Sequence, residues 1–338
     1  MANRFSELAD LEKVVDSVSA KARVKVLDRI THGNLIFPLY SITMGSTAPD
    51  APTLALIGGV HGLERIGSKI VTSYLQTVTE LTKWDEATHQ LLEKTRLVFM
   101  PLLNPAGMYL GTRSNANGVD LMRNSPTDAE TSSRFFLPGG HRYSNRLPWY
   151  RGPENAEMER EAKALCRLVR NELLTSPVSL SLDVHSGYGT VDRIWFPYAK
   201  TKKPFPNLPE VFALKRLLDR TYPNHIYRIE PQSKEYTTHG DLWDYLYDEN
   251  FKTAPQNLFM PLTIELGSWI WVKKNPRQIF SLLGAFNPIH AHRRQRALRR
   301  HLTLFDFMHR AVLSSKSWAQ LPESERGRLT EEATAHWY

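Results

Sequence analysis

The chain contains a single cysteine, Cys166, so no disulfide can form within it. Cys166 lies in an apolar helical pattern, and we interpret it as a small core residue rather than a catalytic nucleophile. No stretch has the roughly 20 apolar residues that a membrane-spanning helix needs. Residues 1–7 are charged and lack the apolar centre of a signal peptide. Together these absences predict a cytoplasmic protein without a membrane partner.

Internal repeats, low-complexity tracts and Gly/Ser-rich linkers are also missing. The apolar fraction of 41% and the charged fraction of 23% are typical of a folded globular protein. We therefore expect one main domain over residues 35–313. Residues 1–34 are expected to form an N-terminal extension, and residues 314–338 a C-terminal tail.

Acidic residues are outnumbered, since 35 Asp and Glu stand against 43 Lys and Arg, and the net charge is +8. Much of the excess lies in one late helical pattern that includes residues 293–300. Such a basic run either binds nucleic acid or forms a solvated helix face. No aromatic side chains on which single strands could stack interrupt the run, so we favour the solvated face and expect no nucleic-acid partner. The sequence gives no indication of the oligomeric state.

Short apolar runs rich in β-branched and aromatic residues alternate with helical patterns along the chain. Helical patterns follow Glu64 and Pro153, and two more cover residues 209–222 and the residues after Pro288. This alternation predicts an α/β fold, with a central mixed, largely parallel sheet flanked by helices on both faces. Ligands bind such sheets beyond the carboxyl ends of the strands. The predicted strands are 35–42, 53–57, 96–100, 180–184, 193–196 and 262–265.

Residues 124–152 break the alternation, because they are rich in turn-forming and aromatic residues. A loop of this length inside a compact domain is usually functional or mobile. We predict that it forms a wall of the substrate cleft. The alternative is a surface insertion packed by its own aromatic side chains. Those aromatic residues are Phe135, Phe136, Tyr143, Trp149 and Tyr150.

Residues with metal-binding side chains come directly after two of the predicted strands. His61 and Glu64 follow the strand at 53–57, and His185 follows the strand at 180–184. Imidazole nitrogen and carboxylate oxygen are zinc ligands, and a catalytic zinc site needs three protein ligands and a water. Glu265 ends another apolar strand, where a buried carboxylate is costly unless it has a partner such as a metal-bound water. The pattern predicts one Zn²⁺ per chain, with Glu265 as the candidate base.

Five motifs follow one another along the chain: His61-Gly62-Leu63-Glu64, residues 112–124, His185-Ser186, residues 236–240 with Asp244, and Thr263-Ile264-Glu265-Leu266. Their order is typical of the zinc carboxypeptidases, the carboxypeptidase A-like metallopeptidases, and over about residues 36–271 the chain resembles this family. A lone His-x-x-Glu pair is weak, but five ordered motifs on the expected elements are specific. The resemblance implies that residues 35–313 form a zinc carboxypeptidase-like catalytic domain. It also implies hydrolysis of an amide bond near the C-terminal carboxylate of a peptide.

The resemblance gives the metal-binding residues their roles. His61, Glu64 and His185 would hold the zinc ion, and Glu265 would act as general base and proton shuttle. The chemistry of the residue types agrees, because zinc lowers the pKa of a bound water to about 7. A nearby carboxylate can then take the proton and return it to the leaving amine.

Three further roles concern the substrate. The resemblance implies that Arg113 stabilises the oxyanion, that Arg123 binds the terminal carboxylate, and that Tyr236 closes over the substrate. A guanidinium suits both charged roles, because its planar fork binds two oxygens and its charge is fixed. The alternative for both arginines is surface salt bridging, which the motif context disfavours.

The chain departs from the family at Met122, which stands where the family usually has Asn before the arginine. Met cannot donate the amide hydrogen bond to a carboxylate. We therefore expect either that Arg123 binds a terminal carboxylate without this partner, or that the pocket accepts another group. His239 is a candidate substrate contact. Trp243 lies near the position expected to shape side-chain preference, and it favours neither a basic nor an acidic pocket.

Other functions remain open. A zinc-dependent amidohydrolase acting on N-acyl amino acids shares the His-x-x-Glu motif and a later His, although Arg113, Arg123 and Tyr236 favour the peptidase. A non-catalytic peptide-binding module is disfavoured because Glu265, which binding alone does not require, is present. His290 and His292 form a second potential metal-binding pair, which we interpret as a surface pair because no third ligand adjoins it.

Overall fold

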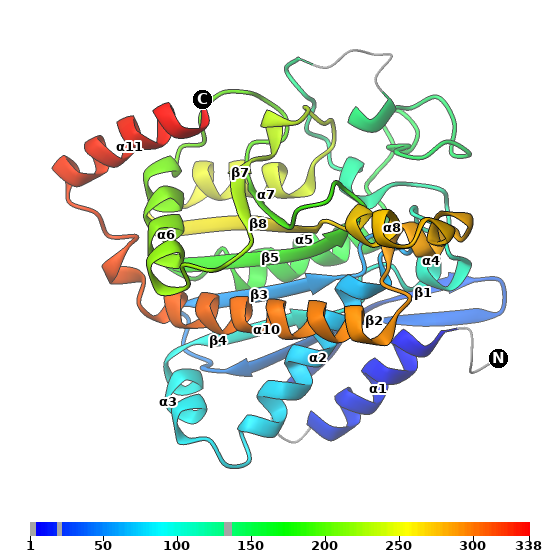
Figure 1. The fold of residues 1–338 in the computed structure, drawn as a ribbon, viewed down its shortest axis with the longest axis horizontal. Coiled ribbons are helices and arrows are strands. Elements are labelled where there is room, and N and C mark those ends of the chain that lie inside the picture. The colour runs from blue at the N-terminus through cyan, green and yellow to red at the C-terminus, as the bar shows by residue number, and fades with distance from the viewer. Residues whose placement is uncertain (1–4, 19–21, 132–136) are drawn as a thin grey trace.

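An eight-stranded sheet forms the centre of the computed structural model, which describes residues 5–18, 22–131 and 137–338 (Figure 1). Across the sheet the strands run in the order β1-β2-β4-β3-β5-β8-β6-β7. The strands are β1 Arg23–His32, β2 Leu35–Gly45, β3 Thr53–Gly58, β4 Arg96–Met100, β5 Val178–Ser186, β6 Arg193–Phe196, β7 Arg228–Pro231 and β8 Leu258–Leu266.

The four strands at the centre, β4, β3, β5 and β8, are parallel to one another. Antiparallel pairing attaches β2 to β4, β1 to β2, and β6 to β8, while β7 is parallel to β6. The predicted mixed, largely parallel sheet is therefore confirmed. Because the four central strands share one direction, their carboxyl ends meet at one edge, where ligands bind in such sheets.

Helices cover both faces of the sheet. One face packs against α1, α2, α10, α6 and α11, and the opposite face against α4, α5 and α7. The helices are α1 Ser6–Val18, α2 Arg65–Leu81, α3 Glu86–Lys94, α4 Pro105–Leu110, α5 Arg160–Glu172, α6 Leu208–Thr221, α7 Leu242–Thr253, α8 Trp269–Lys274, α9 Leu282–Phe286, α10 Ala291–Leu313 and α11 Glu323–Trp337. Short 3₁₀ segments are η2 Leu121–Arg123, η3 Leu137–Gly139, η4 Gln232–Lys234, η5 Pro276–Phe280 and η6 Ser315–Ser317.

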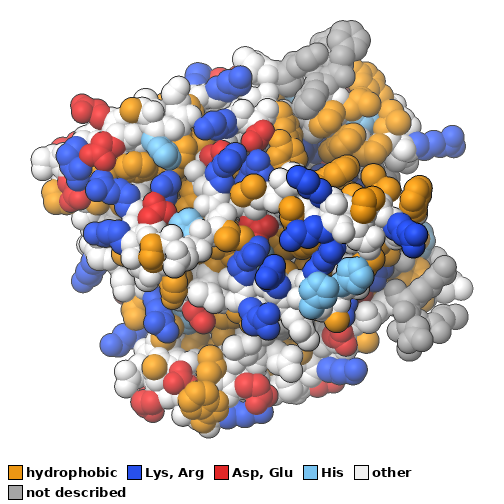
Figure 2. All heavy atoms as spheres, in the orientation of Figure 1, with side chains coloured by type: hydrophobic (Ala, Val, Ile, Leu, Met, Phe, Trp, Pro, Cys, Tyr) orange, Lys and Arg blue, Asp and Glu red, His pale blue; other side chains and the backbone are white. Residues whose placement is uncertain are grey.

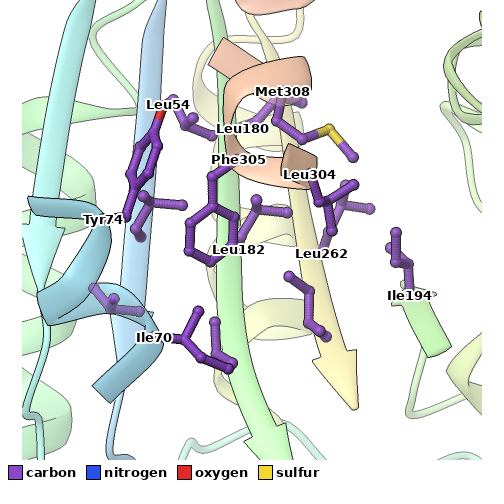
Figure 3. Close-up of a cluster of buried hydrophobic side chains, with 14 of the residues drawn as sticks. Leu54, Ile70, Tyr74, Leu180, Leu182, Ile194, Leu262, Leu304, Phe305 and Met308 are labelled. Atoms are coloured by element: carbon purple, nitrogen blue, oxygen red, sulfur yellow. The ribbon is translucent and has the colours of Figure 1, made fainter. Parts of the chain in front are cut away.

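The sequence of β3, Thr-Leu-Ala-Leu-Ile-Gly, explains how the two layers are fixed. Alternate side chains of a strand point to opposite faces. Leu54 and Leu56 join the core under α2 and α10, whereas Ala55 and Ile57 join the core under α5 and α7. Figure 3 shows the first of these cores, in which side chains of α2 and α10 meet those of the central strands. A strand buried on both faces needs an unbroken apolar run, as this one has.

The ends of the chain extend this fold instead of standing apart from it. Within residues 1–34, expected to be an extension, β1 pairs with β2 along the sheet edge, and α1 buries Leu11, Val14 and Val18 in the core. Within residues 314–338, expected to be a tail, α11 packs on α6 and buries Ala333 and Trp337. Apolar side chains at helical spacing account for the packing of α1 and α11, whereas β1 is held by its pairing with β2.

In the described parts of the chain, no helix combines the length and the apolar character that crossing a membrane requires.

Candidate metal centre and substrate cavity

The loop between β3 and α2 carries His61 and Glu64, and both side chains are buried. The loop lies directly on α4: a Cβ atom on Gly62 would stand 2.1 Å from the backbone carbonyl carbon of Gly107. Glycine at this position lets the two backbones approach, because it has no side chain to clash. The close contact holds His61 and Glu64 beyond the carboxyl end of β3.

His185 reaches the same place from the neighbouring strand. Gly58 at the end of β3 pairs with Val184 of β5, so His185 stands next to the loop that carries His61. On the other side of β5, His185 pairs with Glu265 of β8. The sheet register therefore brings together the three predicted ligands and the predicted base, as the shared edge of parallel strands requires.

The ligand atoms of His61, Glu64 and His185 lie within 4.8 Å of one another. His61 Nδ1 is 2.8 Å from Glu64 Oε1, His185 Nδ1 is 3.0 Å from Glu64 Oε2, and the two Nδ1 atoms are 3.2 Å apart. Ligands held about 2.0–2.1 Å from a tetrahedral zinc ion stand about 3.3 Å from each other. Two imidazole nitrogens and a carboxylate oxygen, converging at this spacing, fit the donor set of a zinc ion.

The second nitrogen of each imidazole faces a buried carboxylate. His61 Nε2 lies 3.1 Å from Asp120 Oδ1, and His185 Nε2 lies 2.8 Å from Asp183 Oδ2. Asp183 also accepts a hydrogen bond from Trp243 Nε1 at 2.9 Å. Such partners keep the proton on Nε2 and turn the Nδ1 lone pair toward a metal. Both aspartates are fully buried, which strengthens their effect on the imidazoles.

Sequence reasoning missed Asp120 and Asp183, although each left a signal. Asp120 stands inside the motif of residues 112–124, between the two arginines that the resemblance singled out. Asp183 precedes His185 by two positions on β5, so both side chains point to the same face of the strand. A carboxylate two residues before a ligating histidine on a strand is thus a recognisable pattern.

The electrostatics of the cluster favour a cation. Burial alone would raise the pKa of Glu64, but His61 and His185 hold it well below its ordinary value of 4.5. Burial likewise opposes ionisation of Asp120, yet Arg113 and His61 hold its pKa well below 3.8. Burial would lower the pKa of His185, but Asp183 and Glu64 raise it well above 6.5. Positive charge is therefore strongly favoured at this position.

Glu265 shows the opposite behaviour to Glu64. Burial, and then the negative charge of Glu64, raise the pKa of Glu265 from 4.5 to about 8. Glu265 Oε1 accepts a hydrogen bond from the backbone N–H of Tyr188 at 3.0 Å, which orients the carboxylate. Two carboxylates of one cluster thus differ in their affinity for a proton, which agrees with the predicted roles of Glu64 as a ligand and Glu265 as a base.

Arg113 joins the cluster from the loop after α4. Its Nε donates to Asp120 Oδ2 at 2.8 Å, and its Nη1 lies 3.5 Å from Glu64 Oε1. Asp120 therefore positions both His61 and Arg113. The guanidinium also lies over the ring of Trp149, with its carbon 6.0 Å from the ring centroid. These contacts fix a cation beside the predicted metal ligands and at the cavity.

A cavity of about 980 Å³ opens over the cluster. Eight of the predicted site residues border it: His61, Glu64, Arg113, Met122, Arg123, His185, Tyr236 and Glu265. Much of the remaining wall is apolar or aromatic, and among its large members the sequence analysis placed only Trp149 in a segment predicted to line a cleft. Those members are Leu63, Leu147, Trp149, Tyr188, Trp195, Leu282 and Phe286.

Arg123 is held mainly by backbone carbonyls. Its Nε and Nη2 donate to Pro138 O at 3.2 and 3.1 Å, and its Nη1 donates to Met122 O at 3.1 Å. A guanidinium has five N–H groups, so two of them remain for a ligand. The side chain of Met122 is buried in the core between the sheet and α5, and its sulfur can offer a carboxylate no hydrogen bond.

His239 and Trp243 do not border the cavity. His239 Nδ1 accepts a hydrogen bond from the backbone N–H of Ala129 and lies 3.3 Å from Asp128, both in the loop after η2. Trp243 is buried in α7, where its indole nitrogen donates to Asp183. Instead of facing substrate, Trp243 supports His185 through Asp183.

The loop of residues 124–152 contributes a wall of the cavity, as predicted. Pro138 and residues 145–149 border the cavity from this loop. His141 and Tyr143 stack on each other, with ring centroids 5.4 Å apart, so part of the loop is also packed by its own rings. Phe135 and Phe136, which the prediction included, lie outside the described residues.

Comparison with known proteins agrees with the geometry. The model of the family described as zinc carboxypeptidase matches residues 3–269, and the chain belongs to this family. Carboxypeptidase SOL1 of Arabidopsis thaliana is 25% identical over 284 residues, which cover 78% of this chain and 50% of that protein. The carboxypeptidase N catalytic chain of Homo sapiens is 27% identical over 220 residues, covering 59% and 44% respectively. The chain thus spans about half the length of the curated relatives it matches.

Solved structures share the fold. Bovine thrombin-activatable fibrinolysis inhibitor, in complex with tick carboxypeptidase inhibitor, superposes with a TM-score of 0.62 at 18% identity, covering 91% of this chain and 95% of that one. Carboxypeptidase A from Helicoverpa armigera superposes with a TM-score of 0.63 at 18% identity, covering 90% and 71%. At this identity the likeness concerns the fold alone.

Proposed function

We propose that this chain is a zinc-dependent metallocarboxypeptidase that hydrolyses the peptide bond next to a C-terminal carboxylate. One observation carries the proposal: the convergent ligand atoms of His61, Glu64 and His185 share a single cavity with Glu265 and Arg123. A metal site, a base and a fixed cation for a carboxylate are the parts that such a reaction needs. Family membership supports the same reaction.

His61, Glu64 and His185 would hold the zinc ion, which supplies a Lewis acid and lowers the pKa of a water. Glu265 would take a proton from the attacking water and return it to the leaving amine, a task suited to its raised pKa. Arg113 would stabilise the negative charge that develops on the carbonyl oxygen. Asp120 would keep both His61 and Arg113 in place through its two oxygens.

The substrate would be held at its C-terminus by Arg123, with its two remaining N–H groups toward the carboxylate. Tyr236, which is half-buried at the cavity wall, would close over the bound residue. The wall formed by Leu147, Trp149 and Trp195 favours apolar side chains, because it offers much apolar surface and few polar partners.

Zinc content and a Glu265→Gln variant test the proposal. Purified wild type is expected to hold one zinc ion and to release the C-terminal residue of short peptides. The variant should keep zinc and lose at least about a hundredfold in kcat, because an amide cannot shuttle the proton. Glu331→Gln, at an exposed position of α11, is the matched control and should behave as wild type. A wild type without zinc, or a fully active Glu265→Gln variant, would contradict the mechanism.

A second candidate is a zinc-dependent amidohydrolase of N-acyl amino acids. It would use the same cluster of His61, Glu64 and His185 and the same base, and its substrates also end in a carboxylate, so Met122 affects both candidates alike. Kinetics on matched substrates separate the two: a dipeptide, and the same C-terminal residue carrying an acyl group. Turnover of the acyl amino acid alone would select the amidohydrolase, and zinc-bound protein that turns over neither would indicate a binding module.

A cytoplasmic location remains part of the proposal. Its support is the single buried cysteine, since disulfides are rare in reducing compartments. Fractionation of cells that produce the full-length protein is the direct measurement, and recovery outside the cytoplasm would contradict it.

A further inference from the structure

Residues 266–305, which follow Glu265, contain eight Lys and Arg residues and no Asp or Glu. The net charge of the whole chain is also +8, so the rest of the molecule is neutral. Some of these cations have internal partners, since Arg300 pairs with Asp192 and Arg293 donates to the carbonyl of Trp271. Lys273, Lys274 and Arg277 are exposed, and none has an ion-pair partner among the described residues.

The same segment exposes large apolar side chains. Phe280 is 89% exposed and Leu282 63%, while Ile279, Ile289 and Trp269 are 51%, 51% and 44% exposed. We call residues 269–289 the apolar-basic segment. Figure 2 shows apolar and basic side chains side by side over α8, at the right of the view. Exposed apolar clusters of this kind mark sites of contact with a partner.

The apolar-basic segment is firmly tied to the metal-binding loops. Trp269 Nε1 donates to the carbonyl of Gly187, two residues after His185, at 2.9 Å. Asn287 donates to the carbonyl of Leu63 at 2.7 Å and accepts from the N–H of Ile66 at 2.9 Å. Leu282 and Phe286 also border the cavity. Whatever the segment contacts is therefore brought to the cavity mouth.

We propose that the apolar-basic segment docks the protein on the surface of an anionic lipid bilayer. Charge of a single sign selects an anionic partner, and each Lys or Arg near such a surface adds to the attraction. Phe280 protrudes almost uncovered, so a peptide lying on it would bury little of it, whereas a bilayer interface surrounds a protruding ring on all sides. Docking would present the cavity mouth to the lipid surface. The expectation of no membrane partner rested on the lack of a membrane-spanning segment, and docking on a lipid surface requires no such segment.

Co-sedimentation of the full chain with vesicles tests the proposal. The protein is expected to bind phosphatidylcholine vesicles that contain phosphatidylglycerol, to bind pure phosphatidylcholine much more weakly, and to dissociate as salt rises. Ile279→Ser with Phe280→Ser should weaken binding at least about tenfold through lost apolar burial. Lys273→Glu, Lys274→Glu and Arg277→Glu together should weaken it at least about tenfold through charge.

Matched controls come from other surfaces of the chain. Trp84→Ser removes another largely exposed aromatic side chain, 74% exposed, between α2 and α3. Lys25→Glu, Lys252→Glu and Lys316→Glu make the same change of charge at exposed positions outside the segment. Both controls should retain most of the binding, and the variants of Ile279 and Phe280 should keep wild-type activity on a soluble peptide.

Several outcomes would overturn the proposal. One is no binding to anionic vesicles at low salt; another is an equal loss in the control variants. Competition by soluble polyglutamate or DNA at equal charge would assign the segment to an acidic peptide or to nucleic acid. A wild-type dimer that Phe280→Ser converts to a monomer, without vesicle binding, would assign it to a second copy of the chain. Vesicle binding, competition and oligomeric state are all measured without peptidase activity, so the failure of this proposal can be distinguished from the failure of the proposed function.

Discussion

His185 of β5 and Glu265 of β8 are paired in register on adjacent parallel strands. A proposed metal ligand and the proposed base therefore share one edge of the sheet, although a long stretch of chain separates them. Because His185 contacts Glu64, the register also places Glu265 near the carboxylate of Glu64. Burial, and then the negative charge of Glu64, raise the pKa of Glu265. Tests of the site can thus address the ligands, the groups that orient them, and the substrate pocket separately.

Asp183→Asn removes the negative charge behind His185 while keeping the shape of the side chain. We expect the affinity for zinc to fall about 10–100-fold, because the amide no longer holds the Nε2 proton as a carboxylate does. Trp243→Phe is the control, since it removes the hydrogen bond to Asp183 but leaves the carboxylate, and it should cost less. Competition with a zinc-binding dye measures both affinities, and an unchanged value for Asp183→Asn would refute the role.

Arg113→Gln tests oxyanion stabilisation. Loss of the cation should lower kcat about 10²–10³-fold with little change in KM, because the charge it offsets appears only in the transition state. Arg146→Gln changes an exposed arginine of the same cavity and should leave kcat nearly intact. Steady-state kinetics on one peptide give both numbers. A rise in KM alone would instead place Arg113 in ground-state binding.

Met122→Asn restores an amide donor beside Arg123. If the pocket binds a terminal carboxylate, one added hydrogen bond to a charged group should lower KM about tenfold. The same peptide with an amidated C-terminus is the control and should show no gain. Equal effects on both peptides would mean that the group next to Arg123 is not a carboxylate.

His309 predicts acid sensitivity of the fold. It is buried in α10, where Nε2 lies 2.7 Å from Thr95 Oγ1. Burial, with a smaller effect of Arg310, lowers its pKa from 6.5 to about 3. Between these two pKa values the unfolded chain binds a proton at His309 and the folded chain does not. The contribution of His309 to the free energy of unfolding should therefore be fully present above pH 6.5 and should decrease as the pH falls toward 3.

The measurement for His309 is urea unfolding across this pH range. Wild type should lose about 3 kcal/mol through this group by about pH 4. His309→Gln should be less stable at neutral pH but should show a shallower dependence on pH. His89→Gln, on the exposed face of α3, is the control and should keep the wild-type slope. Parallel pH profiles for wild type and His309→Gln would contradict the assignment.

Much of the core sheet was predictable from sequence, because buried parallel strands are nearly unbroken apolar runs. The runs at 53–57 and 96–100 became β3 and β4 almost residue for residue. β1 was missed for the opposite reason. β1 is a largely exposed edge strand with charges at Arg23, Lys25 and Asp28, and its partner supplies the order that its own composition does not.

Some residues of the site were predictable from the sequence, and others were not. His61, Glu64, His185 and Glu265 could be found because each stands directly after or at the end of an apolar strand, so that local pattern and position agree. Trp243 was misleading, because spacing along a helix does not tell which side chain faces a cavity and which faces Asp183.

By itself, the sequence determined the chemistry available: two imidazoles and two carboxylates at strand ends, with two arginines nearby. Only the tertiary structure decided which groups act on one another. Parallel register set His185 beside Glu265, and burial separated the proton affinities of Glu64 and Glu265. Packing also brought Leu282 and Phe286, from the apolar-basic segment, to the wall of the cavity. Distances and burial arise from contacts between distant segments, and no local pattern of residues encodes them.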